Sequence, residues 1–176
     1  MSRSFLPDRR TVCRTLMSGA LFATGPARAE SWAEGRNALR IVVFKSQRKL
    51  MLVRAGAAFR TFPIALGAHP KGPKREAGDT RTPEGSYLID GFNEQSRYCR
   101  ALHISYPNAE DMRRASAAGL SPGGNIEIHG MPAQFDDYDP IAFDKDWTDG
   151  CIAVSNRAIK VIWASVSLDT PVDIMA

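Results

Sequence analysis

One cysteine and one histidine in this chain occupy positions that suit nucleophilic catalysis. Cys151 follows Gly150 in the segment DWTDGCIAV, residues 146–154, and His129 ends an apolar, strand-like stretch 22 positions earlier. A thiolate can attack a carbonyl carbon, and a nearby imidazole can take and return the protons involved. The chain has three cysteines and three histidines, so few other pairs could do this work. We therefore take Cys151 as the candidate nucleophile and His129 as the candidate base.

Short strands separated by turns rich in glycine and proline are expected to position this pair. The apolar patterns predict strands over residues 39–45, 50–53, 58–66, 85–89, 101–105, 125–129 and 172–174. Gln47 and Arg48 lie near a turn between the first two stretches, which pair naturally as a hairpin. Residues 172–174 are expected to add an edge strand.

Two segments carry helical signals. Residues 108–118 begin at Asn108 and residues 155–166 begin at Ser155, both of which are typical N-cap residues. The second segment has an apolar stripe made by Ile159, Ile162 and Trp163. The whole pattern predicts a mostly β domain with two or so short helices, arranged as a sandwich or barrel.

The first 29 residues are predicted to be an export signal peptide. Arg9 and Arg10 precede a weakly apolar stretch over residues 16–23, and the small residues Ala27 and Ala29 suit a signal peptidase. Paired arginines are typical of twin-arginine signals, and the secretory route accepts the same composition. The alternative is a disordered or helical cytoplasmic N-terminus. We expect a short linker over residues 30–38, a catalytic domain over residues 39–176, and a location in the periplasm or cell envelope.

The positive charge of the chain belongs to this leader. The chain has 23 basic and 19 acidic residues and a pI near 9.1. Five arginines and one aspartate lie in residues 1–29, which leaves 18 basic and 18 acidic residues in the rest. A neutral domain of about 147 residues gives no reason to expect a nucleic-acid partner. It also contains no second hydrophobic stretch that could span a membrane.

Cys99 and Cys151 remain once the leader, with Cys13, is removed. Two cysteines in an exported protein can form a disulfide. Such a bridge would block the candidate nucleophile, so two free thiols are favoured.

Four motifs in order make this chain resemble the YkuD-type L,D-transpeptidase catalytic domain. They are GDTRTPEGSY (78–87), LHISYPN (102–108), IHG (128–130) and TDGCIAVSN (148–156). The resemblance covers roughly residues 39–175. It implies a β-rich fold, no cofactor, and a cysteine acyl-enzyme that works on peptidoglycan stem peptides. Most members take the acyl group of an L,D bond at meso-diaminopimelate and pass it to an amine.

The resemblance assigns roles to five residues around the candidate pair. Cys151 takes the position of the family's nucleophile, and His129 that of its catalytic base, followed by Gly130 as in the family. Gly150 should let the backbone turn sharply, so that amides near Gly150 and Cys151 face a developing oxyanion. The hydroxyl of Thr148 either holds this turn or contacts substrate.

Two departures from the family pattern bear on the reaction. Asp149 replaces a histidine of the common Ser/Thr-His-Gly-Cys pattern, and Ala153 stands where many members carry arginine or asparagine. The form WTxGCIAV is similar to a branch that includes hydrolases releasing lipoprotein from peptidoglycan. The predicted function is a peptidoglycan-modifying cysteine acyltransferase, with stem peptides and an envelope lipoprotein as candidate partners. The alternatives are a hydrolase of peptidoglycan–lipoprotein or L,D peptide bonds, and a non-catalytic envelope-binding module.

Further acidic residues near the candidate site suggest two more hypotheses. Asp136, Asp137, Asp139 and Asp149 either lie in a solvated loop or attract a cationic substrate group. His129, Cys151 and Asp149 have the side-chain types of a zinc site, but no close ligand pair accompanies them, so no metal is expected. A backbone carbonyl and an acidic side chain are both candidates to orient His129. His103 is expected to be structural.

Overall fold

The computed structural model describes residues 39–132 and 145–176. The predicted signal peptide, the predicted linker, and Asp136, Asp137 and Asp139 lie outside the described residues. Within them, the chain is mostly β with two helices, as the sequence predicts.

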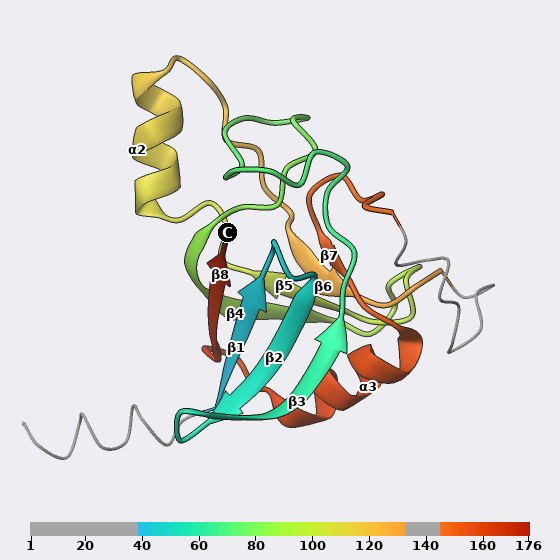
Figure 1. The fold of residues 1–176 in the computed structure, drawn as a ribbon. Coiled ribbons are helices and arrows are strands. Elements are labelled where there is room, and N and C mark those ends of the chain that lie inside the picture. Colours follow the sequence, from blue (N-terminus) through green and yellow to red (C-terminus); the bar gives the residue numbers. More distant parts are fainter. Residues whose placement is uncertain (1–38, 133–144) are drawn as a thin grey trace, which may run out of the picture.

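Eight strands of the described chain form one strongly curved sheet (Figure 1). Their order across the sheet is β3-β2-β1-β8-β4-β5-β6-β7. The strands are β1 (Arg40–Phe44), β2 (Lys49–Arg54), β3 (Ala57–Pro63), β4 (Gly85–Asn93), β5 (Ala101–Ile104), β6 (Glu127–His129), β7 (Ile152–Ala153) and β8 (Pro171–Met175). The predicted hairpin is β1–β2, which pairs Phe44 with Lys49.

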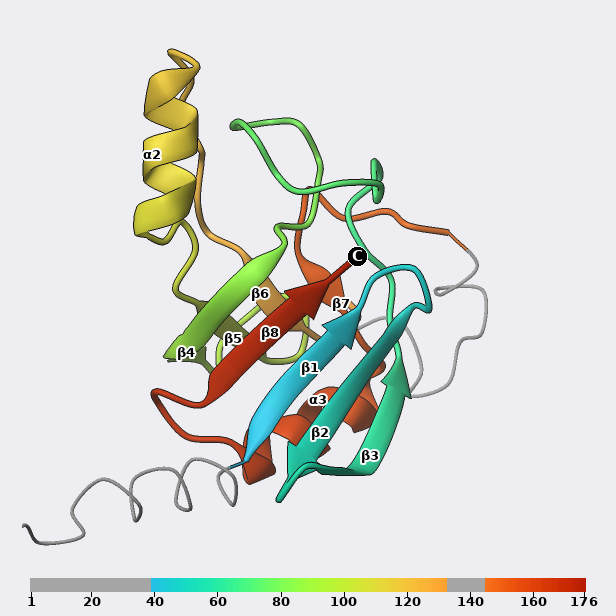
Figure 2. The same ribbon diagram turned by 60° about the vertical axis from the view of Figure 1, so that its left-hand side comes forward.

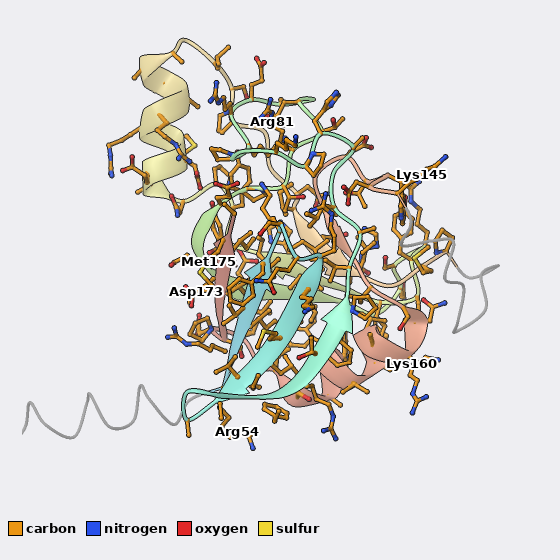
Figure 3. The ribbon with its side chains drawn as sticks, in the orientation of Figure 1. Arg54, Arg81, Lys145, Lys160, Asp173 and Met175 are labelled. Carbon is orange, nitrogen blue, oxygen red and sulfur yellow. The ribbon has the colours of Figure 1, made fainter. Side chains whose placement is uncertain are left out.

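The C-terminal strand β8 is not at the edge of the sheet, so that expectation is wrong. It lies between β1, to which it is parallel, and β4, to which it is antiparallel. Val172 and Ile174 are buried in the core, while Asp173 and Met175 point away from it (Figure 3). A short alternating pattern identifies a strand, but it carries no information about which strands lie on either side.

Strand β4 bends and thereby joins the two halves of the sheet. Its first half, from Gly85 to Leu88, pairs with β8, and its second half pairs with β5. The register shifts between Ile89 and Gly91, as expected where a bulge increases the local bend. The sequence pattern predicted an end at Ile89, whereas the strand continues to Asn93.

The helix α3 (Asn156–Ser165) covers the interior of the curved sheet, behind the β1–β3 half in Figure 2. Its predicted cap is present, because the Ser155 hydroxyl accepts a hydrogen bond from the Ala158 amide. Ile159 and Ile162 are fully buried, and burial of such side chains stabilises the fold by about 2 kcal/mol each. The segment that contains Cys151 leads through β7 directly into this helix. The buried helix therefore anchors the segment.

The helix α2 (Ala109–Ala117) projects from the body of the protein (Figure 1). Its N-terminus has a reciprocal capping box between Asn108 and Asp111. This cap satisfies amides that would otherwise lack partners, and it confirms the start predicted at Asn108.

A buried lysine at the end of the β1 region fixes the loop over residues 67–84. Lys45 is 2% exposed. Its Nζ donates to the carbonyl oxygens of Gly72 (2.7 Å) and Thr82 (2.8 Å) and to Glu84 Oε1 (2.9 Å). Burial lowers the pKa of Lys45, and Glu84 acts in the opposite direction. The Lys45 ammonium thus holds three points of this loop, which packs on the turn at Gly150.

Replacing Lys45 by methionine is expected to lower the free energy of unfolding by about 3 kcal/mol, because Glu84 and two carbonyls lose a charged partner. Chemical denaturation monitored by circular dichroism measures this value. Lys49→Met, at an exposed position of β2, is the matched control and should stay within about 0.5 kcal/mol of wild type. A loss below 1 kcal/mol for Lys45→Met would contradict the role given to Lys45.

Candidate active site

The parallel pair β6–β7 brings His129 and Cys151 to one face of the sheet. Ile128 pairs with Ile152 and His129 pairs with Ala153. Side chains alternate along a strand, so the two isoleucines face the core and His129 faces the other side. Cys151 directly precedes β7, and its sulfur accepts a hydrogen bond from the Glu127 amide at 3.4 Å. Neighbouring strands therefore place the candidate base and nucleophile on the same surface.

Both side chains line a cavity of about 920 Å³. Charged and aromatic side chains surround them there, namely Lys74, Arg97, Tyr98, Glu127, Trp147 and Asp149. The cavity receives residues from the loop before β4, the loop after β4, β6 and the nucleophile turn. A cavity of this size can hold several residues of a peptide.

The Thr148 hydroxyl holds the turn before the nucleophile. Its oxygen accepts from the Gly150 amide (3.2 Å) and donates to the Cys151 carbonyl (2.7 Å). Thr148 is 4% exposed, which favours the turn-holding role over a contact with substrate. Of the two amides expected to face an oxyanion, that of Gly150 is already engaged, and that of Cys151 remains the candidate.

Both the backbone conformation at position 150 and the lack of room for a side chain there require a glycine. Its φ angle is +127°, in a region that side chains other than hydrogen rarely allow. A Cβ atom there would lie 2.7 Å from the carbonyl oxygen of Arg81. The loop that Lys45 fixes thus lies against the backbone of the nucleophile turn.

His129 is held by a backbone carbonyl. Its Nδ1 lies 2.6 Å from the Gly130 oxygen, so Nδ1 carries the proton and Nε2 is left as the proton acceptor. His129 is 2% exposed, and its ring stacks on Tyr98 at 4.4 Å between centroids and meets Trp147 edge-on at 5.9 Å. Of the two orienting groups considered from sequence, the structure has the carbonyl.

Gly130 allows the chain to pass closely behind this histidine. A Cβ atom there would lie 2.6 Å from Asn156 Oδ1 and 2.8 Å from the Tyr98 carbonyl. Asn156 Oδ1 accepts from the Met131 amide at 2.8 Å, which ties the chain after the base to the start of α3.

The thiol and the imidazole are both neutral in the free protein at neutral pH. Burial raises the pKa of Cys151 to about 11, opposed by the hydrogen bond from the Glu127 amide and reinforced by the carboxylates of Glu127 and Asp149. Burial also lowers the pKa of His129, against the hydrogen bond to Gly130. A resting thiolate–imidazolium pair is therefore disfavoured, and the proton has to move as the sulfur attacks.

Alkylation of Cys151 by iodoacetamide is expected to accelerate about tenfold per pH unit from pH 7 to 10, because only the thiolate reacts. A thiol with a pKa near 11 remains below its midpoint over this range. A free thiol of pKa near 8.5 would instead level off by about pH 9.5. Mass spectrometry of the peptide that contains Cys151 measures the rate, with circular dichroism confirming the fold at each pH. A plateau below pH 9 would show that the Cys151 thiol is more acidic than its burial implies.

Other residues predicted from sequence have different surroundings. Asp149 lines the cavity but is exposed. Ala153 is fully buried and packs with Ala65 and Met131, so this departure from the family pattern lies away from the cavity space. Cys99 and Cys151 are both free thiols.

His103 pairs with Asp90 at 2.5 Å on a partly exposed part of β5. No group of three or more histidine, cysteine, aspartate or glutamate side chains in the described chain is arranged to hold a metal ion. The helices described here include none that is long and apolar enough to cross a membrane.

Sequence reasoning missed four charged or aromatic residues that line the cavity, namely Lys74, Arg97, Tyr98 and Glu127. Glu127 could have been found, because it precedes His129 by two residues and a strand places both on one face. Arg97 and Tyr98 lie in the loop that follows the unpredicted half of β4. No local pattern indicates that this loop turns back over His129.

The comparisons with known proteins agree on one family. Residues 38–174 match the family described as the L,D-transpeptidase catalytic domain. YafK of Escherichia coli (strain K12), a protein named as an L,D-transpeptidase, is 31% identical over 133 residues, covering 72% of this chain and 46% of YafK. The chain therefore spans about half the length of that relative.

Two solved structures resemble the fold. Bd1075 of Bdellovibrio bacteriovorus has a TM-score of 0.59 and 26% identity, covering 81% of this chain and 49% of that one. The helical cell shape determining protein Pgp2 of Campylobacter jejuni has a TM-score of 0.58 and 25% identity, with coverages of 78% and 47%.

Proposed function

Because the chain belongs to the L,D-transpeptidase catalytic domain family, we propose that it is a peptidoglycan-modifying cysteine acyltransferase. It acts on stem peptides that contain meso-diaminopimelate, through a thioester on Cys151. The observation that carries this proposal is the presence of His129 and Cys151 in one cavity, with His129 on β6 and Cys151 directly before the paired strand β7. In this proposal Cys151 is the nucleophile, and His129 accepts and then donates the proton.

In the first half of the reaction, the Cys151 sulfur attacks the carbonyl carbon of the L,D peptide bond as its proton passes to His129 Nε2. The Cys151 amide donates to the oxyanion that forms. The tetrahedral intermediate collapses, the carbon–nitrogen bond breaks, and the imidazolium gives its proton to the departing amine. A thioester and a neutral imidazole remain.

In the second half, an amine attacks the thioester carbonyl and His129 Nε2 takes a proton from its nitrogen. The carbon–sulfur bond breaks, and the sulfur recovers a proton from the imidazolium. The product is a new amide. If water replaces the amine, the same steps release a carboxylic acid, so one site supports both transfer and hydrolysis.

The setting that suits this chemistry is the cell envelope. The proposed signal peptide, with Arg9 and Arg10 before a weakly apolar stretch, supports export to the periplasm. Stem peptides of peptidoglycan are the proposed partners, and an envelope lipoprotein is a second candidate. No cofactor is required by the proposed steps.

Incubation with defined muropeptides tests the proposal. A tetrapeptide donor with an amine acceptor should yield a joined product of higher mass, detected by mass spectrometry. Intact-protein mass spectra should show the acyl group on Cys151. Loss of the terminal residue without joining would identify a hydrolase instead. Absence of any product and of any covalent adduct would contradict the proposal, provided that iodoacetamide still labels Cys151.

A further inference from the structure

Glu127 is a cavity carboxylate placed directly beside the candidate nucleophile. It lies on β6 two residues before His129, so its side chain points to the same face. Its own amide donates to the Cys151 sulfur at 3.4 Å, and its side chain lines the cavity. A group bound by this carboxylate would therefore lie near both the sulfur and the imidazole.

The charge of Glu127 is not neutralised by its described neighbours. Its side chain makes no hydrogen bond within residues 39–132 and 145–176. The opposing residue on β5 is His103, but that ring is engaged by Asp90 at 2.5 Å. Burial accordingly raises the pKa of Glu127, with a weaker opposing effect from His103. Keeping a half-buried carboxylate charged without a close partner costs free energy.

The cations that line the cavity are also committed to other groups. Lys74 Nζ lies 2.6 Å from Asp79 Oδ1, and the Arg97 guanidinium lies 4.8 Å from the centre of the Tyr98 ring. Neither forms an ion pair with Glu127 in the described chain. The cavity therefore offers an anionic position beside the sulfur that a cation from outside can fill.

We propose that Glu127 binds a primary ammonium group of the substrate. This inference rests on the proposed function, since it assigns a specificity residue to the same site. Asp149 also lines the cavity, but it is exposed, where water screens its charge more strongly than in the half-buried position of Glu127. The ammonium has two sources in the proposed reaction, the side chain of the acyl donor and the protonated amine of the acceptor, which passes one proton to solvent before its nitrogen attacks.

Separate measurements on the two half-reactions distinguish these sources. The donor arm compares acyl-enzyme formation from a meso-diaminopimelate tetrapeptide with formation from the same peptide acetylated on its side-chain amine. The acceptor arm compares transfer to a diaminopimelate amine with transfer to hydroxylamine, which is neutral at pH 7. Each comparison uses wild type, Glu127→Gln and the control Glu110→Gln. Glu110 lies on α2, where it pairs with Arg113.

In Glu127→Gln, kcat/KM should fall about tenfold or more in the arm whose ammonium Glu127 binds, which corresponds to loss of one charged hydrogen bond. The neutral substrate of that arm should change less than threefold, and Glu110→Gln should match wild type throughout. Equal losses with charged and neutral substrates, or no loss in either arm, would overturn the proposal. If wild type acylates with neither donor, the proposed function fails, and this assignment falls with it.

Discussion

Replacing Cys151 by alanine is expected to abolish turnover, with a fall of about 10⁴-fold or more in the rate of product formation. The cavity loses the sulfur that forms the thioester, and no other cysteine lines it in the described chain. Cys151→Ser should fail as well, because a serine hydroxyl is a much weaker nucleophile than a thiol at this site. Product analysis and intact-protein mass spectrometry measure the effect.

The fold should tolerate the alanine. Within residues 39–132 and 145–176, the Cys151 sulfur has two weak polar contacts, at 3.4 Å to the Glu127 amide and 3.7 Å to the Asn125 carbonyl. The free energy of unfolding should therefore change by about 1 kcal/mol or less. Cys99→Ala is the matched control, since Cys99 packs against the hydrophobic core, and it should keep its activity. Turnover by purified Cys151→Ala would remove the covalent mechanism.

Replacing His129 by glutamine is expected to slow acylation by about 10²- to 10⁴-fold. The thiol, with a pKa raised to about 11, loses the group that accepts its proton. The residual rate of the variant should then rise with pH, about tenfold per unit to pH 10, as hydroxide supplies the thiolate. A loss smaller than fivefold would show that another group serves as the base.

The pH profile of wild type gives a second test of His129. Burial lowers its pKa below the usual 6.5, so the ring stays neutral and active as a base at pH 6.5 and above. Activity should be lost as pH falls through that lowered pKa, and His129→Gln should lack this acidic limb. A wild-type rate that already halves near pH 7 would contradict the assignment.

Local features of the fold were predictable from sequence. The helix caps at Asn108 and Ser155 depend on residues close together in the chain. The same holds for the β1–β2 hairpin, whose turn contains Arg48 with a φ angle of +51°. The central place of β8 and the two-residue strand β7 depend on pairing between distant segments. Patterns within a segment do not specify such pairings.

The same distinction applies to the candidate site, where features within one segment were predictable and contacts between distant segments were not. Cys151, Gly150 and Thr148 form one local turn, and family resemblance connects that turn with His129. The stacking of Tyr98 on His129 depends on how far β4 extends. Engagement of the Gly150 amide by Thr148 depends on a side-chain rotamer. Neither property is encoded in spacing alone.

The position of β8 has a consequence for biosynthesis. While residues 171–175 are still inside the ribosome, the hairpin β1–β2 and the strand β4 have no strand to connect them. A nascent chain arrested at that stage exposes two open strand edges, which favour association with other chains. A nonsense codon just before Pro171 would therefore yield an aggregating fragment, because the strand that joins the two halves of the sheet would be lost.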